Sequence, residues 1–333
     1  YNLILKYTVD SEVSGKNVKH ILKTKMKLSE RLIKKLKYQG KILCNHKPVL
    51  INYVVSQDDT IEVDLDVEEG DESVTPQNIP IDIIYEDESL IAINKKPGFL
   101  VHPTSLQPDG TLANALSYYL QSKGAVKKVR PVIRLDKDTS GIIIFAKDSF
   151  SQSFLVKQMN QKSFIKEYIG VVHGIVTPEA GVIDMPIARM PGSIIKRQIS
   201  PDGSPSVTHY NVIEYLNNAT VLKFRLETGR THQIRVHCQA IGHSLIGDTL
   251  YPPLPDCETK DILLSSDAND TCISGNNTEI SRNNSYFHMS EIIDRQALHS
   301  FRVEFVHPYS GKTLELIAPI PDDITRAVEI LRK

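Results

Sequence analysis

The sequence has 333 residues, of which 41% are hydrophobic and 24% charged, an ordinary composition for a globular protein. It excludes collagen-like, wholly disordered and disulfide-scaffold proteins, and its length suggests two domains or one large domain with an appendage. The net charge of −1 argues against a nucleic-acid partner, but residues 16–47 hold ten lysines and Arg31 against Glu30, whereas residues 58–72 hold nine acids and no base. This asymmetry is typical of a local phosphate-binding surface, although a charged helix that faces solvent would explain it equally well.

Residues 1–66 are predicted to form a small separate module. Ser14 and Ser29 are candidate N-caps for two short helices, and Gly40 ends the second helix. Short apolar runs follow, and then a strand with alternating apolar residues over 60–66. This order of two helices and a hairpin, with a lysine-rich second helix, resembles the S4 RNA-binding domain. The resemblance implies that three lysines of the second helix contact phosphates, namely Lys34, Lys35 and Lys37.

Residues 67–80 are acidic, contain two prolines and lack an apolar period, which predicts a linker. The larger domain is expected over residues 81–333. Its predicted strands cover residues 81–87, 89–95, 131–136, 141–147, 166–174, 220–227, 301–307 and 313–319. Its predicted helices cover residues 111–123, 149–160, 231–242 and 321–333. Because strands and helices do not alternate steadily, the pattern favours an α+β fold with a mixed, largely antiparallel sheet and flanking helices. The polar residues 252–290 are expected to form an inserted surface loop.

The most informative segment is Arg134-Leu-Asp-Lys-Asp-Thr-Ser-Gly141, a polar turn between two apolar strands. A carboxylate at such a strand end, here Asp136, lies at the edge of the sheet, where a cleft can form. Taken alone, such a turn more commonly holds an aspartate that only caps it.

The segment RLDKDTSG resembles the catalytic motif of the RluA family of pseudouridine synthases, in which the aspartate is the nucleophile. Further segments are similar to that family in the same order. They cover residues 94–103, 166–174, 203–210, 228–251 and 295–308. Together with the S4-like module, the architecture is similar to the subgroup that modifies large-subunit ribosomal RNA. The resemblance implies an isomerase that converts uridine in RNA to pseudouridine, without a cofactor or a metal.

The resemblance also implies roles for individual residues. Asp136 would be the nucleophile, Tyr168 would stack on the base and manage a proton, and Arg235 would keep the carboxylate ionised. Arg134 would fill the space that the flipped base vacates, while Arg230 would contact a phosphate or only shape its turn. On the predicted helix that carries Arg235, Thr231 is the expected N-cap and Cys238 is expected in the core.

Two alternatives remain open, namely an inactive RNA-binding or ribosome-assembly factor of the same fold, and transfer RNA in place of ribosomal RNA as substrate. A glycosidase ranks below both, because the motif supplies one carboxylate where two are required. The histidines lack the spacing of a metal site. The cysteines lie far apart and no window is apolar enough to span a bilayer, so the expected protein is a cytoplasmic monomer.

Overall fold

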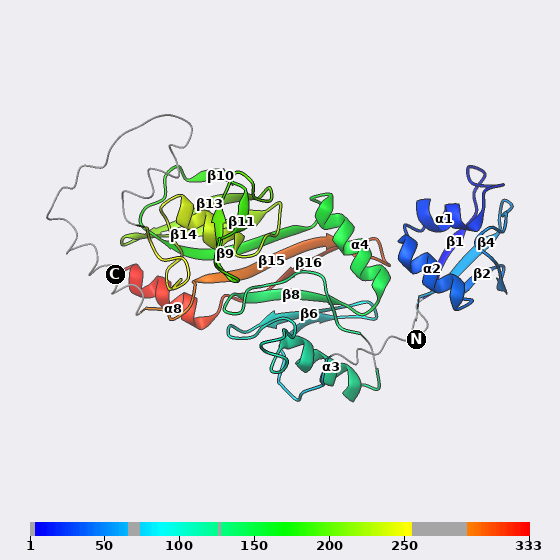
Figure 1. Ribbon diagram of the computed structural model, residues 1–333, viewed down its shortest axis with the longest axis horizontal. Helices are drawn as coiled ribbons and strands as arrows, with labels where there is room; N and C mark the ends of the chain where they lie inside the picture. Colours follow the sequence, from blue (N-terminus) through cyan, green and yellow to red (C-terminus); the bar gives the residue numbers. More distant parts are fainter. Residues whose placement is uncertain (1–3, 66–73, 126–127, 255–291) are drawn as a thin grey trace.

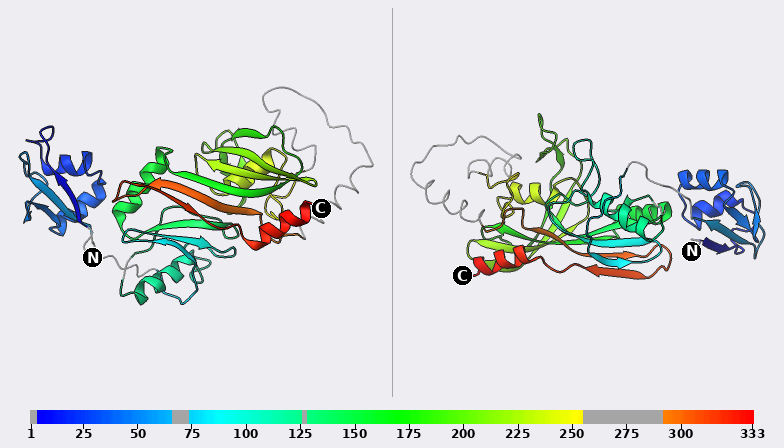
Figure 2. Two further views of the ribbon diagram at one scale, coloured as in Figure 1. Left: turned by 180° about the vertical axis from the view of Figure 1, so that it is seen from behind. Right: turned by 90° about the horizontal axis from the view of Figure 1, so that it is seen from below.

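The computed structural model describes residues 4–65, 74–125, 128–254 and 292–333. The chain forms two sheets with separate hydrophobic cores, and a two-stranded ribbon accompanies the larger sheet. The N-terminal module and the C-terminal helix lie at opposite ends of an elongated molecule (Figures 1 and 2).

The N-terminal module is a four-stranded sheet in the order β1-β4-β2-β3, covered by two helices. The strands are β1 (Ile4–Thr8), β2 (Ile42–Cys44), β3 (Lys47–Pro48) and β4 (Thr60–Asp64), and the helices are α1 (Val18–Thr24) and α2 (Glu30–Tyr38). As predicted, Ser29 caps α2 and Gly40 follows that helix with a positive φ of 64°. The predicted cap at Ser14 is wrong, because α1 begins later and Asn17 caps it by accepting from the backbone N–H of His20.

The apolar side of α2 faces the core of the module, where Leu32, Ile33 and Leu36 are buried. Phe150, from a helix of the larger domain, joins the same buried cluster. The module therefore packs against that domain through an aromatic contact.

The larger sheet follows the order β10-β13-β14-β9-β15-β8-β6-β5, while β16 pairs with β15 and β7 pairs with β8. Its strands are β5 (Ile83–Glu86), β6 (Leu90–Lys95), β7 (Arg130–Pro131), β8 (Ser140–Ala146), β9 (Ile165–His173), β10 (Ala180–Asp184), β13 (Val207–Leu216), β14 (Ala219–Leu226), β15 (Leu298–Val306) and β16 (Thr313–Ile317). Neighbouring strands within this sheet are antiparallel, except for the parallel pair of β15 and β8. The expected α+β class with a largely antiparallel sheet is confirmed.

Within the described residues, four helices flank this sheet near the positions that the sequence predicts. They are α3 (Leu112–Ser122), α4 (Ser149–Asn160), α5 (Gln233–Ala240) and α8 (Asp322–Leu331). The remaining ribbon consists of β11 (Ile187–Arg189) and β12 (Arg197–Ile199), which no sequence pattern predicted.

Three expectations about the larger domain need correction. The strand predicted over 131–136 is only the two-residue β7, and the chain then leaves the sheet. The described part of the predicted linker belongs to the domain, since Val74 lies in its core and the Asn114 side chain donates to the Thr75 carbonyl. Most of the predicted insertion, residues 255–291, lies outside the described residues, as does the acidic run 66–73.

Candidate active site

Asp136 lies in the turn that leads into β8, and the turn is held from several sides. The Thr139 N–H donates to the Asp136 carbonyl at 3.2 Å. The Lys95 ammonium donates to the next carbonyl, that of Lys137, at 2.6 Å, and Arg295 donates to the carbonyl of Asp138 at 3.0 Å. These contacts fix the backbone on which the carboxylate is mounted.

The start of β8 also depends on a glycine. Gly141 has a φ of 107°, and a Cβ at this position would lie 2.2 Å from the carbonyl oxygen of Ser300 on β15. Only glycine permits both this backbone conformation and this close approach. Thr139 and Ser140 support the turn, because Thr139 accepts from the Gln296 side chain and Ser140 pairs with His299.

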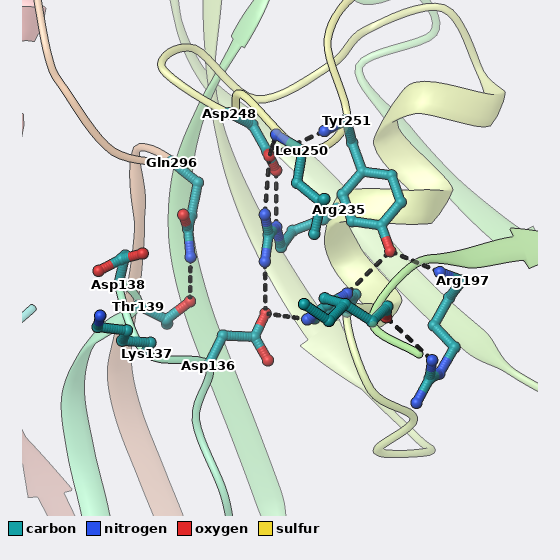
Figure 3. A network of polar contacts seen from close by, with 12 residues as sticks. Asp136, Lys137, Asp138, Thr139, Arg197, Arg235, Asp248, Leu250, Tyr251 and Gln296 are labelled. Atoms are coloured by element: carbon teal, nitrogen blue, oxygen red, sulfur yellow. Dashed lines mark hydrogen bonds and ion pairs between the residues drawn. The ribbon is translucent and has the colours of Figure 1, made fainter. Parts of the chain in front are cut away.

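Arg235 of α5 joins two carboxylates, as Figure 3 shows. Its Nη1 donates to Oδ2 of Asp136 at 3.2 Å, while Nε and Nη2 donate to the two oxygens of Asp248 at 2.7 and 2.8 Å. The Asp248 side chain has no exposure and also accepts from the backbone N–H groups of Leu250 and Tyr251, whereas the Asp136 side chain is 23% exposed. Asp248 therefore holds the guanidinium in place, and Asp136 is the carboxylate that a substrate can reach.

The charge state of Arg235 is secured by the same pairing. Burial alone would lower the pKa of the guanidinium, but the hydrogen bonds and the charge of Asp248 outweigh it and raise that pKa. The cation also lies 5.1 Å from the ring centroid of Tyr251. The site thus contains a permanent, oriented cation beside an accessible carboxylate.

Tyr168 lies on β9 between Phe224 of β14 and Ser300 of β15, and only 6% of it is exposed. Burial raises the pKa of the phenol, and the negative charge of Asp136 raises it further, so the hydroxyl is protonated at neutral pH. The structure thus brings together the three residues that the sequence motifs indicated for catalysis, Asp136, Tyr168 and Arg235.

The other predicted site residues lie away from this cluster or are held differently. Arg134 is exposed in the loop two residues before Asp136. Arg230 is exposed. Its Nε donates to the Pro205 carbonyl at 3.3 Å, and its backbone N–H donates to the side-chain oxygen of Gln233. The Cys238 side chain is fully buried, as expected.

Three lysines of the N-terminal module, here called the α2 lysines, are Lys34, Lys35 and Lys37. Lys34 lies on the side of α2 opposite its buried residues, Lys35 and Lys37 flank that buried side, and Lys34 and Lys37 are exposed while Lys35 is partly buried. Because α2 belongs to the other domain, these lysines contribute nothing directly to the cluster around Asp136.

The structure adds His232, for which no sequence pattern indicated a role. His232 adopts a left-handed conformation with φ 60° and occupies the N-cap of α5, so the N-cap predicted at Thr231 is wrong. Its Nε2 lies 3.9 Å from Oδ2 of Asp136, and its Nδ1 lies 2.8 Å from the Tyr251 hydroxyl. A non-glycine residue in this conformation beside an accessible carboxylate is the kind of strain that clusters at functional sites.

The tautomer of His232 follows from its neighbours. The Tyr251 hydroxyl accepts from the backbone N–H of Arg197 at 2.8 Å, and burial raises the pKa of this phenol, so it keeps a proton that needs an acceptor. Within the described residues, Nδ1 of His232 is the group that can accept it. Burial lowers the pKa of His232, although the charge of Asp136 opposes that shift. The ring is therefore neutral at pH 7, with its N–H at Nε2 directed toward Asp136.

Among the described residues, no group of three or more histidine, cysteine or acidic side chains could hold a metal ion. No helix of the described part is long and apolar enough to cross a membrane.

Residues 89–240 match a family model described as RNA pseudouridylate synthase. The chain is 35% identical over 303 residues to the "Uncharacterized RNA pseudouridine synthase YjbO" of Bacillus subtilis, which covers 91% of this chain and 95% of that protein. It is 39% identical over 259 residues to the "Ribosomal large subunit pseudouridine synthase D" of Escherichia coli K12, covering 77% and 72%. The solved structure of "Human RNA Pseudouridylate Synthase Domain Containing 4" shares the fold, with a TM-score of 0.56 at 20% identity over 75% of this chain and 93% of that one.

Proposed function

Because this chain belongs to the RluA family of RNA pseudouridine synthases and is thus an RNA-modifying isomerase, we propose that it converts uridines of large-subunit ribosomal RNA to pseudouridine, with Asp136 as the nucleophile. The observation that carries the assignment of Asp136 is the bridge from its carboxylate through Arg235 to the buried Asp248. A protein that only bound RNA would have no use for an accessible carboxylate held by a buried, oriented cation in this way.

The reaction breaks the bond between C1′ of the ribose and N1 of uracil, turns the base, and joins C1′ to C5. The proton lost from C5 is balanced by the proton that N1 gains, so no atom is added or removed. The Asp136 carboxylate adds to the base or acts at the ribose, and on either route Arg235 donates a hydrogen bond to it. Since Arg235 is itself fixed by Asp248, the carboxylate is oriented before the substrate arrives.

Tyr168 and His232 supply neutral hydrogen-bond donors around the nucleophile. The Tyr168 ring offers a face for uracil, and its hydroxyl, which stays protonated, can donate a hydrogen bond but cannot take the C5 proton as a base. The gap of 3.9 Å between His232 Nε2 and the carboxylate is too long for a hydrogen bond. We assign the N–H at Nε2 to an oxygen of the bound uridine.

Three features support RNA, and ribosomal RNA in particular, as the substrate. The α2 lysines form a basic surface on the N-terminal module, which we interpret as an S4-like RNA-binding domain. Arg134 precedes the nucleophile and is exposed, so it can enter the stack when the target base leaves it. Relatives that align over most of their length carry the name ribosomal large subunit pseudouridine synthase D.

The test is a map of pseudouridines in total RNA from cells with the gene, without it, and with the gene encoding Asp136→Asn. We expect one or more sites in large-subunit ribosomal RNA to disappear on deletion and to return only with the wild-type gene. Loss of sites in transfer RNA alone would make transfer RNA the substrate. An unchanged pseudouridine map in the deletion cells would contradict the proposal. If those cells also had a defective ribosome profile, the result would favour a ribosome-assembly factor.

A further inference from the structure

Arg295 lies just before β15 and is buried, with only 6% of the residue exposed. It forms a two-pronged ion pair with Asp323, the second residue of α8. Nε of Arg295 donates to Oδ2 of Asp323 at 2.6 Å, and Nη2 donates to Oδ1 at 2.9 Å. A carboxylate that binds both prongs fixes the plane of the guanidinium, so the directions of its other N–H bonds are fixed as well.

The other N–H groups of Arg295 point at the turn that carries Asp136. Nη1 donates to the Asp138 carbonyl at 3.0 Å, and Nη2 donates to Oγ of Ser140 at 3.3 Å. Nη1 also donates to two carbonyls of its own segment, at 3.3 and 3.4 Å. The guanidinium therefore joins the C-terminal helix to the backbone two residues after the proposed nucleophile.

The segment that begins at Arg295 runs alongside this turn and contacts it repeatedly. The Gln296 side chain donates to Oγ1 of Thr139 at 3.2 Å (Figure 3). Nδ1 of His299 lies 2.9 Å from Oγ of Ser140, and these two residues are also partners in the parallel pairing of β15 with β8. A displacement of this segment would therefore displace the turn with it.

The loop that carries Asp248 rests on the same segment. A Cβ at Gly247 would lie 2.2 Å from the carbonyl oxygen of Arg295, so the two backbones are in direct contact. The Ala297 N–H donates to the Ile246 carbonyl at 2.8 Å. The carboxylate that orients the other arginine of the site is therefore supported by the segment that holds the backbone of the turn.

The helix α8 packs against both of these supports, at the end of the molecule opposite the N-terminal module (Figure 1). One buried hydrophobic cluster contains Ile246, two positions before Asp248, and Ile293, two positions before Arg295. The buried residues of α8 in this cluster are Ile324, Ala327 and Leu331. The apolar face of α8 thus sets where the helix lies, and Asp323 at its start reaches Arg295.

The ion pair is better suited to orientation than to stability. The loss of hydration of two buried charged groups offsets most of their attraction, so such a pair is a weak means of stabilising a fold. The Asp323 side chain is 27% exposed, so water can solvate Arg295 if the carboxylate is replaced. The planar guanidinium instead offers fixed directions, and it directs them at the turn of the nucleophile.

We propose that Asp323 and Arg295 are a positioning pair through which the C-terminal helix holds the turn of the nucleophile. Asp323 orients Arg295, and Arg295 fixes the Asp138 carbonyl, so the Asp136 carboxylate stays aligned before the substrate arrives. The pair acts through the backbone of the turn rather than on the uridine. This inference rests on the proposed function, since it assigns the turn to the isomerisation.

The positioning pair is tested with Asp323→Asn, and the matched control is Asp322→Asn. Asp322 is the exposed neighbour in the first turn of α8, so each variant removes one charge from the same end of the helix. The substrate is an unmodified transcript of large-subunit ribosomal RNA labelled with tritium at C5 of uridine. For Asp323→Asn we expect kcat for tritium release to fall about tenfold or more, while KM and the RNA dissociation constant stay close to those of wild type. Asp323→Glu, which keeps the charge, should recover part of kcat, and the control should behave as wild type.

A second measurement does not depend on turnover. Amide hydrogen exchange of peptides that span residues 136–141 reports the order of the turn, and peptides from the other strands report the order of the sheet. We expect exchange in the turn to be faster in Asp323→Asn than in Asp322→Asn, with equal exchange in the other strands.

Equal kcat or equal exchange of the turn in the two variants would overturn the positioning pair. Faster exchange throughout the sheet in Asp323→Asn, with a lower thermal unfolding midpoint, would also overturn it and would make the ion pair a general stabiliser of the fold. If wild type and the control release no tritium from any RNA, the proposed function fails, and the exchange comparison still decides whether Asp323 orders the turn.

Discussion

Replacing Arg235 by alanine should have two separable effects, because the guanidinium serves two carboxylates. Asp248 has no exposed side-chain surface and would lose both charged hydrogen bonds, at 2.7 and 2.8 Å. Removing one partner of a buried ion pair costs about 3–5 kcal/mol, a large share of the roughly 5–15 kcal/mol that stabilises a typical fold. We therefore expect the free energy of unfolding of Arg235→Ala to fall by about that amount.

The double variant Arg235→Met/Asp248→Asn separates stability from chemistry. It replaces the buried pair with neutral groups of similar size, so no unpaired charge is left and most of the stability should return. Asp136 would still lack its cation. A hydrogen bond to a charged group is worth about 1.5–3 kcal/mol, which corresponds to roughly a tenfold to hundredfold loss of rate.

These effects are measured by urea unfolding and by tritium release between pH 5 and pH 8. Arg235→Lys should recover part of the rate, because lysine restores the charge without the two-pronged geometry. The reasoning fails if the double variant is stable and as active as wild type. Arg235 would then be a structural residue of α5 and nothing more.

Three further predictions concern the surroundings of the site and the N-terminal module. Burial lowers the pKa of Lys95 from 10.5 to about 7. Between pH 7 and pH 10.5 the unfolded chain therefore binds more protons at Lys95 than the folded chain does. The contribution of Lys95 to the free energy of unfolding consequently rises with pH over this range. Urea unfolding at pH 7 and pH 9 should show a rise larger in wild type than in Lys95→Met by about 2 kcal/mol, and equal rises would contradict the burial argument. His232→Gln, which keeps an N–H donor, should retain more of kcat than His232→Ala, with little change in RNA affinity. Equal activity of both variants would contradict the proposed hydrogen bond from His232 to the uridine. Alanine at all three α2 lysines should reduce the slope of log K against log salt concentration for RNA binding by about 0.7–0.9 for each phosphate that is no longer neutralised. An unchanged slope would mean that these lysines only face solvent.

The sequence predicted the parts of the site that lie in continuous segments. The RLDKDTSG turn, the β9 tyrosine and the α5 arginine each belong to a local pattern, and strand and helix periods located most of the elements that carry them. The local cap rule failed at α5, because His232 takes the N-cap in a left-handed conformation that its contact with Tyr251 holds. A propensity rule would not choose histidine for that position.

The support of the turn could not be predicted from the sequence. Lys95 and Arg295 hold neighbouring carbonyls of one turn, although they lie 42 and 157 positions from those carbonyls in the chain. Asp248 follows Arg235 by 13 residues with no helical spacing, so the bridge appears only when α5 and the following loop are folded together. The strand predicted through Asp136 was also wrong, because β7 ends at Pro131 and Asp136 lies in a loop.

The most direct test of the proposed chemistry compares wild type with Asp136→Asn on tritium-labelled large-subunit ribosomal RNA. The substitution keeps the size of the side chain and a hydrogen-bonding oxygen toward Arg235, but it removes the charge and the nucleophile. We predict that tritium release is lost while the thermal unfolding midpoint and the RNA dissociation constant stay close to those of wild type. Tritium release at the wild-type rate would contradict the central claim that Asp136 carries out the isomerisation.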